Sequence, residues 1–221
     1  MSDANTPPST VIQIDIISDV MCPWCIVGFK QLEMALAQTR TGARVRWHPF
    51  ELNPDMPMDG ENLGDHIKRK YGSTEADSAQ NRQHICDLGS ALGFAFNFSD
   101  DSRIVNSFDA HVLLDFAATK GLQHPLKLAL FAAHFTESRN IADRDVLIAV
   151  GQSIGLDPAQ ADQALNTDTH AKAVRAQQAV WAQNGISGVP TMIFDEKYLI
   201  SGAQGPQNYA KMIQKVQAEA V

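Results

Sequence analysis

The sequence predicts an α/β fold in which two strand-containing segments flank a long block of helices. Three observations predict it. Residues 11–50 follow a strand–helix–strand pattern, residues 62–183 are helical in period nearly throughout, and residues 190–220 follow a strand–strand–helix pattern. With 221 residues and 44% hydrophobic side chains, the chain can bury a full core in one large domain that carries an insertion.

The first elements frame a pair of cysteines. Residues 11–18 are mostly apolar, which is typical of a strand that is buried on both faces. A helical spacing of apolar residues covers 23–39, and a second strand follows at 44–50. Because the connections are short and contain one helix, we expect the two strands to be parallel. The polar segment 1–10 is expected to be a disordered tail.

The middle of the chain shows no convincing strand between residues 62 and 183. Its periodicity and its glycine and proline breaks predict helices near 62–71, 75–92, 106–120, 124–136, 143–154, 158–165 and 168–184.

Strand patterns return at 190–194 and 197–201, and an amphipathic helix is predicted at 206–220. The chain is therefore divided into the tail 1–10, a discontinuous α/β domain of 11–58 and 184–221, and an inserted helical domain of 59–183.

Cys22 and Cys25 are three residues apart, a spacing that puts both on one face of a helix and lets their thiols close a small disulfide ring. Pro23 suits the first helical turn, so Cys22 falls at the helix N-terminus. Unpaired N–H groups and the helix dipole stabilise a thiolate there. We predict Cys22 as the attacking thiol and Cys25 as the buried resolving thiol in thiol–disulfide exchange.

Other uses of these cysteines are less consistent with the sequence. Half of a zinc site would need further ligands, and Cys86 stands alone, so no metal ligand is assigned. A structural disulfide over three residues would constrain the unfolded chain very little. Cys86 is interpreted as an inert buried thiol. Five histidines show no metal-ligand grouping and are taken as structural: His66, His84, His124, His134 and His170.

The Cys-Pro-Trp-Cys run at 22–25 and the Gly-Val-Pro-Thr run at 188–191 resemble the thioredoxin fold. The long helical block resembles the insertion of its DsbA-like branch. The expected fold class is therefore α/β, a thioredoxin fold with a large all-helical insertion. A narrower resemblance, to the FrnE-like subgroup, is carried by four segments: 18–25, 49–54, 106–111 and 198–204. That subgroup is cytoplasmic and is related to 2-hydroxychromene-2-carboxylate isomerases and kappa-class glutathione transferases.

The resemblance implies a substrate-binding surface around the thiols. Pro190 is expected to be cis and to lie against the disulfide, and the backbone of Val189 is expected to pair with an extended substrate segment. Pro23 and Trp24 are expected to contact the substrate, with Trp24 as a wall for substrate or glutathione. Isomerase and transferase relatives generally carry serine in place of Cys22, so the intact pair favours redox chemistry.

Two further pairs of residues keep two interpretations each. Asn106 and His111 are expected near the substrate because an asparagine in such a helix approaches the substrate in the isomerase relatives. The alternative is a helix-capping asparagine and a structural histidine. His48 and Glu51 follow the second strand, either as proton carriers near the thiols or as exposed edge residues.

The expected function is that of a thiol–disulfide oxidoreductase or isomerase acting on protein or small-molecule disulfides. The alternatives are a glutathione-dependent isomerase or transferase of small aromatic or polyketide-like molecules, and a non-catalytic redox-sensing or chaperone-like module. No bound cofactor is expected, and glutathione is a candidate co-substrate. Relatives are often dimers, so a homodimer is one expected assembly.

Charge and hydropathy restrict the partners. A net charge of −7 argues against a nucleic-acid partner, which would need a basic face. No apolar run approaches eighteen residues, so no membrane partner is expected. The N-terminus lacks the basic start and apolar stretch of a secretory signal, which predicts a cytoplasmic protein.

Overall fold

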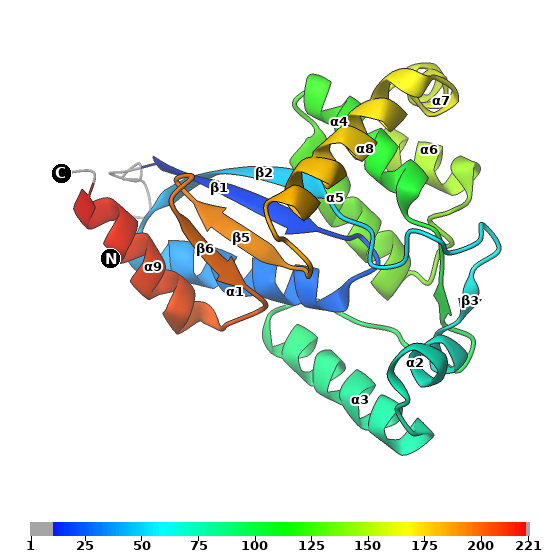
Figure 1. Cartoon of the computed structure of the whole chain (residues 1–221), viewed down its shortest axis with the longest axis horizontal. Coiled ribbons are helices and arrows are strands. Elements are labelled where there is room, and N and C mark those ends of the chain that lie inside the picture. The colour runs from blue at the N-terminus through cyan, green and yellow to red at the C-terminus, as the bar shows by residue number, and fades with distance from the viewer. Residues whose placement is uncertain (1–10, 220–221) are drawn as a thin grey trace.

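A computed structural model describes residues 11–219, and the tail predicted for residues 1–10 lies outside them. Its centre is a mixed sheet in the order β2-β1-β5-β6, shown in Figure 1. β1 (Val11–Ser18) pairs in parallel with β2 (Gly42–Pro49) along its whole length. β5 (Thr191–Phe194) runs antiparallel to β1, and β6 (Tyr198–Ser201) runs antiparallel to β5. The predicted first and last segments thus form one sheet.

Two helices complete this part of the fold. α1 (Pro23–Thr39) follows β1, and α9 (Pro206–Glu219) ends the described chain and packs along α1. Their apolar faces share one core with the inward-facing side chains of β1 and β5, including Phe29, Phe194 and Tyr209. This packing holds the start of α1, and with it the two cysteines, against the sheet.

The middle of the chain forms two groups of helices, on different sides in Figure 1. The first group has a second core of its own, built around Leu113, Leu126 and Leu147. Its members are α4 (Phe108–Thr119), α5 (Gln123–Phe131) with the π-helical segment Ala132–Thr136, α6 (Arg144–Ser153), α7 (Pro158–Asn166) and α8 (Asp168–Gln183). The second group, α2 (Leu63–Tyr71) and α3 (Glu75–Ala91), lies below the sheet in this view.

The expectation of no strand in the middle region is wrong at two short places. β3 (Glu61–Asn62) pairs with β4 (Arg103–Ile104) in an antiparallel ribbon beside α2. A two-residue strand carries no alternation of its own, so a periodicity argument has nothing to detect. Within residues 11–219, no helix has both the length and the apolar character that crossing a membrane requires.

Candidate active site

Cys22 and Cys25 lie at the junction between β1 and α1. Cys22 is the residue before the helix and Pro23 occupies its first turn, as the spacing predicts. The Cys22 N–H donates to the Asp19 carbonyl at 3.2 Å, and the Cys25 N–H donates to the Cys22 carbonyl at 3.0 Å. Both thiols are reduced and in mutual contact, with Cys22 4% exposed and Cys25 fully buried.

The two thiols shift each other's pKa in opposite directions. Contact with Cys25 raises the pKa of Cys22 well above its ordinary value, and burial adds to this. Burial alone would raise the pKa of Cys25, but contact with the Cys22 thiol and the positive charge of Lys127 lower it. These shifts favour ionisation of Cys25, whereas the helix-terminus argument favours ionisation of Cys22. The difference comes from the contact between the two thiols and from a lysine that is distant in sequence.

Lys127 is the charged residue behind the thiols that sequence reasoning missed. It comes from α5 and is 1% exposed, with Nζ 3.4 Å from the Ser18 carbonyl oxygen. The rings of Trp47 and Phe131 cover the ammonium at 5.4 and 5.1 Å. Burial lowers the pKa of Lys127 to about 8, against the opposing effect of nearby negative charges, led by Cys25. A lysine in the apolar run Leu126–Phe131 is the one signal that could have indicated it.

Asp19 is a second buried charge and orders the loop before Cys22. Its carboxylate accepts hydrogen bonds from the backbone N–H of Met21 at 3.1 Å and of Leu52 at 2.7 Å. His111 Nε2 lies 3.5 Å from Asp19 Oδ1. Burial alone would raise the pKa of Asp19, but His111 and the two backbone donors lower it. The carboxylate is thus kept ionised a short way from the thiols.

Asn106 and His111, both predicted near the substrate, do not border the cavity at Cys22 that is described below. His111 is 2% exposed, and its ring lies next to the Asp19 carboxylate. Asn106 donates to the Met56 carbonyl at 2.7 Å and accepts from the Phe108 N–H at 2.9 Å, at the start of α4. Asn106 thus lies one residue before Ser107, the N-cap of α4, and a role of either residue in substrate binding stays a prediction.

Val189 and Pro190, which come just before β5, lie beside Cys22 and α1. The Val189–Pro190 peptide bond is cis, and the Cys22 thiol donates to the Val189 carbonyl oxygen at 3.7 Å. Gly28 makes this close approach possible, since a Cβ there would lie 3.2 Å from Pro190 Cγ. The start of β5 and the helix α1 are therefore packed against each other at the thiols.

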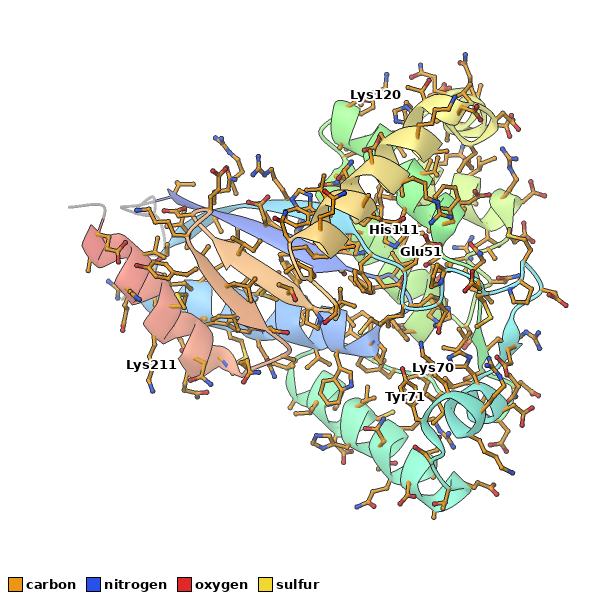
Figure 2. The ribbon with its side chains drawn as sticks, viewed as in Figure 1. Glu51, Lys70, Tyr71, His111, Lys120 and Lys211 are labelled. Carbon is orange, nitrogen blue, oxygen red and sulfur yellow. The ribbon has the colours of Figure 1, made fainter. Side chains whose placement is uncertain are left out.

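A cavity of about 680 Å³ opens in front of Cys22. Pro23 and Trp24, both predicted to contact substrate, line it together with Met21. The opposite wall comes from α2 and α3, and Tyr71 at the end of α2 is labelled in Figure 2. Cys25 is not among the residues that border this cavity in the described chain, so Cys22 is the sulfur that a ligand would meet.

Two histidines taken as structural also border this cavity. His134 lies in the π-helical segment after α5, where burial lowers its pKa to about 4, so it is neutral. His66 is 3% exposed, and its Nδ1 lies 2.9 Å from Glu61 Oε2. The two side chains border the same cavity only because α2 and the π-helical segment after α5 are folded next to it.

The remaining candidates lie elsewhere. His48 Nε2 is 2.7 Å from Asp15 Oδ1, and its ring packs on Trp181. Glu51 is buried and paired with Arg175. Neither is paired with the cysteines, and neither is an exposed edge residue.

Cys86, predicted as a buried inert thiol, is half-buried on α3, where it donates to the Phe96 carbonyl at 3.6 Å. Burial raises its pKa. Among residues 11–219, no three metal-binding side chains of the His, Cys, Asp and Glu types gather in one place.

Comparisons with known proteins agree with this fold. A curated relative, the uncharacterized protein YwbO of Bacillus subtilis, is 30% identical over 203 residues, which cover 91% of this chain and 96% of the relative. The crystal structure of a probable DsbA oxidoreductase from Streptomyces coelicolor superposes with a TM-score of 0.88 at 29% identity, covering 94% of this chain and 91% of that one.

A more distant structure shares the fold alone. The cytosolic disulfide reductase DsbM from Pseudomonas aeruginosa, in a structure with glutathione, superposes with a TM-score of 0.63 at 18% identity and covers 93% of this chain and 99% of its own. The family model described as the DSBA-like thioredoxin domain matches residues 13–214. The chain therefore belongs to the DSBA-like thioredoxin domain family and has the DsbA-like thioredoxin fold with a helical insertion.

Proposed function

We propose that the protein is a thiol–disulfide oxidoreductase or isomerase that acts through Cys22 and Cys25. The observation that carries the proposal is a contacting pair of reduced thiols in which Cys22 borders a large cavity and Cys25 lies behind it. The positive charge of Lys127 beside the pair lowers the pKa of Cys25, and exchange depends on a thiolate.

In the reductive direction, the proton on Cys22 passes to Cys25 as Cys22 Sγ attacks one sulfur of a substrate disulfide. The substrate S–S bond breaks, a disulfide forms between Cys22 and the substrate, and the first substrate sulfur leaves. The proton then passes from Cys25 to a departing sulfur, and Cys25 Sγ attacks Cys22 Sγ. The second substrate sulfur leaves, and two electrons have moved from the protein dithiol to the substrate.

Two thiols of a co-substrate return the protein to the dithiol by the reverse exchange. Glutathione is the proposed co-substrate, supported by its presence in the DsbM structure of the same fold. Disulfides of proteins or small molecules are the proposed substrates. A cytoplasmic location, membership of the FrnE-like subgroup and a homodimer stay predictions of the sequence.

The second candidate function is a glutathione-dependent isomerisation or transfer on a small aromatic molecule. The observation that favours it is the cavity, because its volume lies within the range of small-molecule sites. In that reaction Cys22 would only orient a glutathione thiol, a role that a serine hydroxyl can also fill.

Substitution of the thiols separates these functions. Cys22→Ser is expected to abolish exchange with hydroxyethyl disulfide in the presence of glutathione, since the attacking sulfur is gone. Cys25→Ser is expected to stop after the first step and to accumulate the Cys22 mixed disulfide, visible by mass spectrometry. Cys86→Ser is the matched control and should keep full activity. Exchange that survives Cys22→Ser would refute the proposed function.

A further inference from the structure

The cavity in front of Cys22 has the size of a small-molecule site. Its volume of about 680 Å³ lies within the range of about 300–1,000 Å³ that is common for such sites. Cys22, only 4% exposed, borders it together with residues of α2 and α3. A small-molecule disulfide can enter this cavity and reach Cys22 more readily than a disulfide on the surface of a folded protein can.

The cavity wall carries an excess of positive charge. Three arginines border it: Arg82, Arg103 and Arg139. Arg82 is half-buried on α3, donates to Ser78 Oγ at 2.8 Å, and forms no ion pair within residues 11–219. Arg103 donates to the Asp59 carbonyl oxygen at 2.7 Å. Their guanidinium groups therefore keep donors for an incoming anion.

The other charged groups on the wall do not cancel this excess. Arg139 has an exposed partner in Glu137 at 3.4 Å, which makes a weak pair. Asp77 is occupied at the start of α3, where its carboxylate accepts hydrogen bonds from the N–H and hydroxyl of Thr74. Asp101 is exposed. Arg82 is thus the half-buried cation of this wall that lacks a carboxylate partner in the described chain.

Apart from these charged groups, the lining combines apolar side chains with uncharged polar ones such as Asn81 and Ser138. The apolar side chains include Met21, Trp24, Leu52, Ile67, Ile85 and Phe98. A ligand that fits this surface has an apolar or uncharged middle part and an anionic end. The guanidinium group of an arginine can bind the two oxygens of a carboxylate with two parallel hydrogen bonds.

We propose that the cavity selects low-molecular-weight disulfides that carry carboxylate groups, with the reacting sulfur at Cys22 and a carboxylate at Arg82. This inference rests on the proposed function, because it names the substrate class of that exchange. It makes Arg82 a substrate-binding residue, in a helix that is remote from the cysteines in sequence.

The test compares model disulfides of different charge on the reduced protein, followed by intrinsic fluorescence, since Trp24 lies between the thiols. Oxidised glutathione is anionic, hydroxyethyl disulfide is neutral and cystamine is cationic. The second-order rate constant is expected to fall in that order. Arg82→Ala is expected to lower the rate with oxidised glutathione about tenfold, the effect of losing a charge-assisted hydrogen bond, and to leave the neutral disulfide unchanged.

Arg44→Ala is the matched control, because Arg44 is an exposed arginine at the start of β2 and does not border the cavity. Equal rates for the three disulfides, an equal effect of Arg82→Ala on all of them, or faster reaction with the disulfides of insulin than with oxidised glutathione would overturn the inference while exchange itself persists.

Binding of S-methylglutathione, which cannot exchange, gives an independent measurement by calorimetry. About tenfold weaker binding to Arg82→Ala supports the anion site even if no disulfide reacts, in which case only the proposed function fails. Unchanged binding, or no binding to the wild-type protein, counts against the site.

Discussion

At the scale of single residues, Lys127 is the buried positive charge that lowers the pKa of one thiol of the pair. Its ammonium is buried between Trp47 and Phe131 and lowers the pKa of Cys25 against the effect of burial. Contact with Cys25 and burial raise the pKa of Cys22, and the negative charge of Asp19 adds to this. Two buried charges, on Lys127 and Asp19, thus act on the thiols in addition to the contact between them.

Lys127→Met tests this arrangement. Without the ammonium, the pKa of Cys25 rises, and we expect the first thiol ionisation to move to higher pH, which lowers the thiolate fraction at neutral pH. Absorbance of the thiolate at 240 nm during a pH titration measures the shift.

Lys211→Met is the control, since Lys211 is exposed on α9 at the far end of the molecule in Figure 2. The methionine side chain occupies much of the space of the lysine stem, and a urea unfolding curve checks that the variant is folded. An unchanged titration of a folded Lys127→Met protein would rule out the role given to this lysine.

At the scale of the elements, a buried carboxylate ties β1 to its parallel neighbour β2. Asp15 is 3% exposed in β1 and accepts hydrogen bonds from Arg46 Nε at 2.7 Å and Nη2 at 3.0 Å. His48, also in β2, lies 2.7 Å from the same carboxylate. Burial alone would raise the pKa of Asp15, but these hydrogen bonds lower it to about 2.

This pairing predicts how acid acts on the fold. Because the folded pKa of Asp15 lies below its ordinary value of 3.8, its contribution to stability is present above pH 4 and is lost as the pH falls toward 2. Asp15→Asn is expected to be less stable than wild type at pH 7 and to lose less stability between pH 4 and pH 2.

Urea unfolding at a series of pH values measures both effects. Asp55→Asn, at an exposed position in the loop after β2, is the control and should follow wild type. Parallel acid profiles for wild type and Asp15→Asn would show that the carboxylate does not stabilise the strand pair.

At the scale of the whole molecule, α3 joins the cavity wall to the body of the fold. Ile85 lies in the main core, and Gly89 packs against the loop that follows the helix. A Cβ at Gly89 would come within 2.5 Å of Phe96 Cδ2 and 2.6 Å of the Phe94 carbonyl oxygen. The position of the wall therefore depends on the absence of a side chain at one residue.

Gly89→Ala should shift α3 or the loop and lower the free energy of unfolding by about 1–3 kcal/mol, as overpacking does. Urea unfolding measures the loss, and the rate with oxidised glutathione should fall with it as the wall moves. Ser90→Ala, at the next and exposed position, is the control. A Gly89→Ala protein with wild-type stability would show that Phe94 and Phe96 can move away from the added methyl group without loss of free energy of unfolding.

Local sequence patterns were sufficient to predict the elements and the position of the thiols. Apolar runs, helix periods and the placement of Pro23 depend on neighbours in the chain, so the sheet, nearly all the helices and the Cys22–Cys25 pair could be predicted from them. The sequence also carries the resemblance to the DsbA-like branch, which the family match confirms. The two-residue strands β3 and β4 were not predicted, because they are too short to show a pattern.

Only the tertiary structure decided the electrostatics and the shape of the site. Lys127, His134 and Arg82 are far from Cys22 in sequence, and no spacing rule links them to it. They act on the thiols or the cavity because α5 and α3 pack on different sides of the same strand–helix junction. Charge and enclosure depend on distances in space, and these distances exist only once the helices have packed.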